Sequence, residues 1–185
     1  MTIDVEIMRQ VDRSEIVDGL YCGRQTSNGF GLELQKINQD PSIKIPSWSE
    51  EGMSSRSKKW QQEIEIGGHM LTASKAGKTV GFGIIGPKHA DGSIELVALF
   101  VSSEVRKSGI GTLLFRQLEA MARMEKASSL LIYSNPTESA VDFYRRQNCE
   151  IVGIADKSLV TRLPWDVVFA KPFESEEKPP NKAST

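Results

Sequence analysis

Apolar and polar positions in the first third of the chain predict only short elements. Apolar and acidic residues alternate over residues 3–8, which is typical of a strand with one buried face. The spacing of Ile16 and Leu20 favours a short helix over residues 14–23. Residues 36–62 combine prolines and serines with little periodicity, so we expect an irregular flap there.

The middle of the chain predicts a hairpin followed by a buried strand. Apolar stretches at residues 69–74 and 79–85 flank a turn-like break, which is typical of a β-hairpin. Residues 94–101 are apolar on both faces except for Glu95, as expected of a central strand that is covered on both sides.

The rest of the chain alternates helix and strand. Residues 111–126 place an apolar stripe on one helical face. The later predicted elements are a strand at 130–133, a helix at 138–147, and strands at 151–154 and 167–170. Residues 173–185 are charged and rich in proline, so we expect a disordered tail behind one mixed α/β domain at 1–172.

Composition narrows the class of protein. A chain of 185 residues suits one domain. Its 23 basic and 24 acidic residues give a net charge of −1, which argues against nucleic-acid binding. No basic leader and no apolar run long enough for a bilayer are visible, so we expect a cytoplasmic protein without a membrane partner. Cys22 and Cys149 lack the spacing of a disulfide framework or a zinc site.

The candidate chemistry lies in the turn at residues 106–111, between the buried strand and the amphipathic helix. The first N–H groups of a helix have no partner inside it, and the helix dipole is positive there, so main-chain donors can hold a pyrophosphate. Gly109 and Gly111 permit close approach, and Arg106 and Lys107 add positive charge. The hydroxyls of Ser108 and Thr112 offer further donors.

This turn resembles the acetyl-CoA-binding motif of the GNAT acetyltransferase superfamily, Gln/Arg-x-x-Gly-x-Gly/Ala. Arg106, Gly109 and Gly111 meet each defined position. Downstream, Asn135 and the run 140–144 resemble the family's second motif, Asn-x-x-Ala-x-x-Phe-Tyr. The chain departs from the family in lacking a proline before Arg106, and in having Asn148-Cys149 where Gly-Phe is usual. Asparagine tolerates the left-handed conformation that a helix end needs there.

The resemblance implies a fold, a cofactor and roles for particular residues. The fold is a mixed, mostly antiparallel sheet, flanked by helices, whose fourth and fifth strands splay apart. Acetyl-CoA is expected as co-substrate, with no metal, and its pantetheine arm pairs with the backbone at Leu99, Phe100 and Val101. The further contacts expected for the cofactor are Arg106, Lys107, Ser108, Gly109, Ile110, Gly111, Thr112, Asn135 and Tyr144. Tyr144 is the expected proton donor to the leaving thiolate, and Glu95 the expected base, acting directly or through water.

The activity implied is transfer of an acetyl group to a primary amine of a small-molecule acceptor. Two alternatives stay open: a CoA-binding regulatory module without catalysis, and an acyltransferase that uses another acyl donor or a hydroxyl acceptor. The sequence names neither the acceptor nor the oligomeric state, and a homodimer is one option.

Several of these residues have structural interpretations too. Tyr144 is also suited to core packing, Glu95 to solvent contact at a sheet end, and Asn135 to capping a helix with Glu138. Trp48 and Trp60 fit either an acceptor pocket or an anchored flap. His69 is an alternative base, although it has no visible partner.

Residues 81–86 match the pattern GxGxxG of a dinucleotide site, but their context does not. The glycines alternate inside a strand-like stretch, and no helix opens after them. We expect these small residues to allow another backbone or the substrate to come close.

Overall fold

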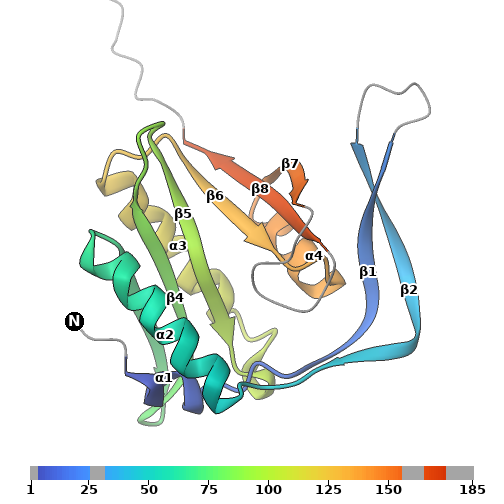
Figure 1. The fold of residues 1–185 in the computed structure, drawn as a ribbon, viewed down its shortest axis with the longest axis horizontal. Coiled ribbons are helices and arrows are strands. Elements are labelled where there is room, and N and C mark those ends of the chain that lie inside the picture. The colour runs from blue at the N-terminus through green and yellow to red at the C-terminus, as the bar shows by residue number, and fades with distance from the viewer. Residues whose placement is uncertain (1–3, 26–31, 156–164, 174–185) are drawn as a thin grey trace, which may run out of the picture.

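The centre of the molecule is a six-stranded mixed sheet (Figure 1). The computed structural model describes residues 4–25, 32–155 and 165–173. The strands are β3 (His69–Lys75), β4 (Lys78–Lys88), β5 (Ser93–Val101), β6 (Ser129–Ser134), β7 (Glu150–Ala155) and β8 (Asp166–Pro172). They lie in the order β3-β4-β5-β6-β8-β7, and every neighbouring pair is antiparallel except β5 and β6. The expected mixed, mostly antiparallel sheet is therefore confirmed.

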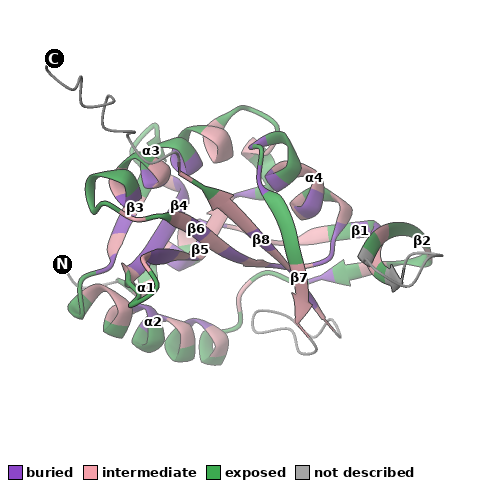
Figure 2. Ribbon diagram, turned by 90° about the horizontal axis from the view of Figure 1, so that it is seen from above, coloured by how far each residue is buried: buried purple, intermediate pink, exposed green. Residues whose placement is uncertain are grey.

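Helices cover both faces of this sheet, so that the molecule has three layers (Figure 2). Helices α1 (Val5–Gln10) and α2 (Glu50–Glu65) lie on one face. Helices α3 (Ile110–Met124) and α4 (Glu138–Arg146) lie on the other. Each face has its own apolar cluster, with Phe115 and Phe169 buried on the α3 side and Trp60 and Phe82 on the α2 side. Helix α3 is amphipathic as expected, since Leu114 and Leu118 are on its buried stripe.

A separate two-stranded hairpin stands beside α4, clear of the main sheet in Figure 1. Its strands are β1 (Glu15–Gln25) and β2 (Leu32–Ile45). The backbone N–H of Tyr21 donates to the carbonyl oxygen of Pro136 at 2.7 Å. The indole Nε1 of Trp165 donates to the carbonyl oxygen of Tyr21 at 2.9 Å. These bonds attach β1 to the residues just before α4 and just before β8.

Three predictions for the first third of the chain are wrong. Within the stretch at 3–8, residue 3 lies outside the described residues, and residues 5–8 belong to helix α1, not to a strand: Asp4 caps the helix and Met8 is buried. Within the stretch at 14–23, residues 15–23 belong to strand β1, not to a helix. The expected flap at 36–62 is regular structure, occupied by most of β2 and α2.

The chain from residue 69 onward follows the predictions more closely. The hairpin, the central strand, both helices and the closing strands are confirmed, with boundaries shifted by a few residues. Asn148 adopts the left-handed conformation at the end of α4, with φ of 58°. Thr137, not Asn135, is the N-cap of α4: its hydroxyl accepts from the Ala140 N–H. Residues 174–185 of the predicted tail lie outside the described residues.

The glycines of the GxGxxG-like stretch bring α3 close to the sheet. A Cβ atom added at Gly83 would lie 2.4 Å from Cδ1 of Leu118, and one at Gly81 would lie 2.9 Å from the carbonyl oxygen of Phe100. The close neighbour is a side chain of α3 at Gly83 and the main chain of β5 at Gly81, and approach of the substrate stays a prediction.

Candidate functional site

Strands β5 and β6 separate halfway along their length. Their parallel pairing covers only Ser93, Ile94 and Glu95 of β5. Directly after it, Ile85 pairs with Leu96 and Ile84 with Ala98, so that Val97 is an extra residue in β5. Such a bulge bends a strand and raises its twist. Beyond the bulge, the β6 side of β5 has no strand partner among the described residues, and the expected splay is present.

The turn after β5 leads into a helix start that no side chain caps. A short 3-10 helix, η1 (Ser103–Val105), precedes Gly109, which is the N-cap of α3 with φ of 90°. The first main-chain N–H to bond into the helix is that of Leu113, which donates to the Gly109 carbonyl oxygen at 3.0 Å. Helices α2 and α4, by contrast, begin with hydroxyl caps from Ser49 and Thr137. The free N–H groups at the start of α3 are therefore available to an anion.

A cleft of about 1310 Å³ joins the splayed strand to this helix start. The predicted cofactor residues that line it are Leu99, Phe100, Val101, Arg106, Lys107, Gly109, Gly111, Thr112, Asn135 and Tyr144. Ser108 and Ile110 are not on its wall, and the Ser108 hydroxyl donates to the Val105 carbonyl oxygen at 2.6 Å. Arg106 is anchored, because its Nε donates to the Val101 carbonyl oxygen at 3.2 Å.

Asn135 gives the cleft an unused polar atom. Its Oδ1 is buried and has no hydrogen-bond partner among the described residues. An unpaired buried acceptor is costly. Thr137 fills the capping role considered for Asn135, whose contact with the cofactor stays a prediction.

Tyr144 borders the same cleft from within the core. Its side chain is only 9% exposed and packs against the rings of Phe115, Phe143 and Phe169. Burial raises its pKa above the ordinary value, and the neighbouring Cys149 adds to the rise. The hydroxyl has no hydrogen bond within the described part of the chain. The phenol therefore stays protonated at neutral pH and combines a packing role with access to the cleft.

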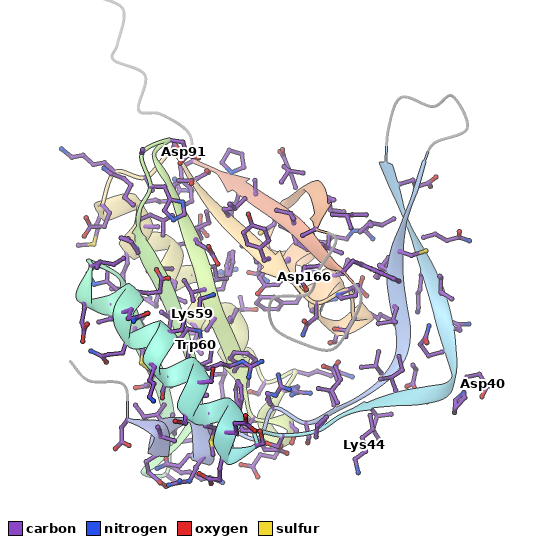
Figure 3. The ribbon with its side chains drawn as sticks, viewed as in Figure 1. Asp40, Lys44, Lys59, Trp60, Asp91 and Asp166 are labelled. Atoms are coloured by element: carbon purple, nitrogen blue, oxygen red, sulfur yellow. The ribbon has the colours of Figure 1, made fainter. Side chains whose placement is uncertain are left out.

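Glu95 lies apart from the cleft wall. Its carboxyl is half-buried, and burial is the main cause that raises its pKa; Lys59 on α2 lowers it and Glu63 on α2 raises it. Figure 3 shows Lys59 beside Trp60 on α2, where that helix crosses β4. The structure therefore puts Glu95 under α2 rather than beside Tyr144, and its role as base stays a prediction.

The hairpin supplies a wall of the cleft that the sequence did not indicate. Residues 13–19 of β1 and its approach line the cleft, together with Lys44 and Ile45 of β2 and the outward face of α4. The glycines of β1 could have indicated from the sequence that another segment packs closely against this strand. A Cβ at Gly19 would lie 2.8 Å from Oε2 of Glu138, and one at Gly23 would lie 2.0 Å from Cδ1 of Ile154.

The carboxylate of Asp12 connects the hairpin wall to the turn that follows β5. Oδ2 of Asp12 accepts from the hydroxyls of Ser103 at 2.7 Å and Ser14 at 2.8 Å. The Ser103 N–H donates to the Asp12 carbonyl oxygen at 2.8 Å. The bond from Ser103, and those from Ser14, hold the pKa of Asp12 well below its usual range. Asp12 thus fixes the start of β1 against the end of β5.

Two other residues considered as candidates, Trp60 and His69, lie off the cleft wall. Trp60 lies in an aromatic cluster with Trp48, Phe82 and Phe100 and does not line the cleft. His69 lies 3.4 Å from Glu125, away from the cleft. No group of three His, Cys, Asp or Glu side chains suited to a metal ion occurs among the described residues, and no described helix has the length and apolar character of a membrane span.

A sequence profile described as "Acetyltransferase (GNAT) domain" matches residues 44–148 of the chain. This match contains the splayed strand, the turn and both motif helices. No curated protein sequence matches the chain.

Solved structures share the fold over most of the chain. A nourseothricin acetyltransferase has a TM-score of 0.72 at 18% identity, and the alignment covers 91% of this chain and 92% of that one. A Bacillus anthracis str. Ames protein described as a streptothricin acetyltransferase, solved with acetyl coenzyme A, has a TM-score of 0.69 at 17% identity, with coverages of 88% and 90%. An aminoglycoside 6'-N-acetyltransferase solved with coenzyme A has a TM-score of 0.58 at 21% identity, with coverages of 68% and 83%. At these identities the likeness concerns the fold.

Proposed function

Because the chain belongs to the GNAT acetyltransferase family, we propose that it transfers an acetyl group from acetyl-CoA to a primary amine of a small-molecule acceptor. The observation that supports this most is the continuous cleft from the free edge of β5 to the uncapped start of α3. That cleft offers main-chain groups to an extended amide-containing arm and N–H donors to a phosphate.

The residues present fit acetyl-CoA, which when bound would supply an activated acetyl thioester. The free edge of β5 at residues 99–101 would pair with the pantetheine arm as a strand would. Asn135, which lines the cleft, would be a further contact for that arm. Arg106 and Lys107 would add positive charge beside the first N–H groups of α3. A Cβ atom added at Gly109 would meet no protein atom within 4 Å, so the space in front of the turn is open.

Two titratable residues carry the proposed proton transfers. Tyr144 keeps its proton at neutral pH and holds it at the cleft, where it can be donated to a leaving thiolate. The raised pKa of Glu95 makes its carboxylate a stronger base towards an ammonium group that must lose a proton before attack. Since Glu95 lies off the cleft wall, we propose that it acts through water.

The proposed acceptor class rests on charged residues of the cleft wall and on the structural neighbours. The hairpin wall carries Glu15 and Asp18, and α4 carries Glu138 and Asp142, all on the cleft. Basic residues line the cleft as well, so we propose that these carboxylates attract an amine only locally, beside the hairpin and the start of α4. The structural neighbours include proteins described as acetyltransferases of nourseothricin and aminoglycosides, which supports a small-molecule amine.

The decisive experiment is calorimetric titration with acetyl-CoA of Gly109→Leu and of the matched variant Gly77→Leu. Both glycines have positive φ and open space around an added Cβ, so both substitutions should cost about 1–2 kcal/mol of backbone strain. Only Gly109 lines the cleft. We expect at least about tenfold weaker acetyl-CoA binding in Gly109→Leu, or about 1.4 kcal/mol, and unchanged binding in Gly77→Leu.

Wild-type protein that bound no acetyl-CoA would refute the proposal. Tight binding without CoA release from any primary amine in a broad panel would favour the regulatory module. Faster turnover with a longer acyl-CoA than with acetyl-CoA, or with an alcohol than with an amine, would favour an acyltransferase with another donor or acceptor.

A further inference from the structure

Two guanidinium groups lie against the indole ring of Trp48, and one of them, that of Arg13, belongs to a residue of the cleft wall. The Cζ atom of Arg13 is 4.6 Å from the centroid of the Trp48 ring, and that of Arg56, on α2, is 5.7 Å away. The ring itself is held firmly: its Nε1 donates to the Val11 carbonyl oxygen at 3.0 Å, and the Phe100 ring packs edge-on at 4.8 Å. The indole therefore acts as a fixed platform for both cations.

Arg13 has no counter-ion within the described part of the chain. Its side chain is half-buried, and its Nε is buried without a hydrogen-bond partner there. Burial and repulsion from Arg56 both lower the pKa of Arg13. Contact with an aromatic face offsets only part of the cost of holding a cation out of water. An anion beside Arg13 would offset the rest.

We propose that Arg13 and Arg56, supported by Trp48, form an anion-binding subsite that takes a carboxylate or phosphate group of the acceptor. Arg13 is itself part of the cleft wall, so that an anion on it would lie in the same space as a bound acceptor. Planar guanidinium groups suit both anions, because they can donate two parallel hydrogen bonds. This inference rests on the proposed function for the meaning of the acceptor.

The position of the pair favours the acceptor over the phosphates of CoA as the source of the anion. Trp48 and Phe100 pack in the cluster under α2, whereas α3 lies on the opposite face of the sheet. The start of α3 has its own cations, Arg106 and Lys107. The subsite thus serves a group that reaches the cleft from the α2 side.

The first experiment follows the ³¹P line width of inorganic phosphate at constant ionic strength, with the protein free and loaded with CoA. We expect saturable broadening by the wild type in both states, and its loss in Arg13→Gln and Arg56→Gln. Lys44→Gln is the matched control, because it removes an exposed cleft-lining cation and should retain the broadening. Equal broadening by all four proteins, or none by the wild type, would overturn the subsite. Broadening that CoA abolishes would assign it to the CoA phosphates instead.

The second experiment measures CoA release with amines in matched pairs, glucosamine 6-phosphate with glucosamine and lysine with 1,5-diaminopentane. Among the pairs that are acetylated, the anionic member should have a kcat/KM about 10- to 100-fold higher, as expected for hydrogen bonds to a charged group. Arg13→Gln should remove this preference and leave the KM for acetyl-CoA unchanged. Preference for the members without an anion would overturn the proposal. A lack of turnover with every amine would count against the proposed function, while the phosphate measurement would still decide the subsite.

Discussion

At the scale of the residue, Tyr144 shows how one side chain serves both the core and the cleft. Its ring packs with three phenylalanine rings, which explains why an aromatic residue stands there. The same burial disfavours the phenolate, so the hydroxyl keeps its proton as the pH rises past the ordinary value of 10.0. The two interpretations of Tyr144 are compatible, because its ring packs in the core while the residue borders the cleft; the raised pKa keeps the phenol protonated but also makes it a weaker acid.

Tyr144→Phe should keep the fold and lose the proton donor. We expect kcat to fall about 100-fold, within the usual range for general acids, with acetyl-CoA affinity nearly unchanged. Steady-state kinetics and calorimetry measure the two effects. Tyr133→Phe changes a tyrosine of β6 that lies off the cleft wall; this variant is the control and should keep full activity.

In the wild type, kcat should show no loss from Tyr144 ionisation between about pH 7 and 10. An unchanged kcat in Tyr144→Phe would leave this side chain with packing alone.

At the scale of the element, a short amphipathic stretch can fit more than one period. Residues 3–8 alternate like a strand, yet residues 5–10 form helix α1, and Met8 is its buried residue. In α2 a helical signal was available, since Ser49 precedes two acidic residues and Met53, Ser57 and Trp60 recur on one face. The prolines before the helix and the serines within it obscured this signal.

Gly83→Ala tests the close packing of α3 on β4. The added methyl group would lie 2.4 Å from Cδ1 of Leu118, so the helix must shift or Leu118 must leave its rotamer. We expect a loss of about 1–3 kcal/mol in the free energy of unfolding, measured by denaturant titration. Gly153→Ala in β7 is the control, because its nearest atom is 4.0 Å away, and it should be neutral or slightly stabilising. An equal loss of unfolding free energy in both variants would mean that the conformational freedom of glycine, rather than the space around it, determines the stability change.

At the scale of the whole molecule, the cleft exists because the hairpin docks on α4. An isolated two-stranded hairpin is marginally stable, so β1 and β2 depend on their contacts with the rest of the molecule. Tyr21 is the centre of those contacts: its hydroxyl donates to Oδ1 of Asp142 at 3.0 Å, and Arg145 stacks over its ring at 5.0 Å. The wall of the site that sequence patterns missed is therefore held by this docking.

Tyr21→Ala should loosen the hairpin while the main sheet stays intact. We expect faster amide hydrogen exchange in β1 and β2, unchanged exchange in β4 and β5, and a loss of about 1–3 kcal/mol in the unfolding free energy. Tyr21→Phe removes only the bond to Asp142 and should have a smaller effect. Uniformly faster exchange across all strands would show that the hairpin and the sheet unfold as one unit.

The sequence by itself determined the turn at 106–111, the helix behind it, the second motif and the order of elements after residue 69. These features depend on neighbours along the chain: glycines at a helix start, charges beside them, and an apolar stripe of helical period. Tertiary structure alone decided the hairpin wall, the place of Glu95 under α2 and the meeting of Arg13 with Arg56 on Trp48. Such contacts join segments far apart in sequence, and local periodicity carries no information about which distant surfaces will pack together.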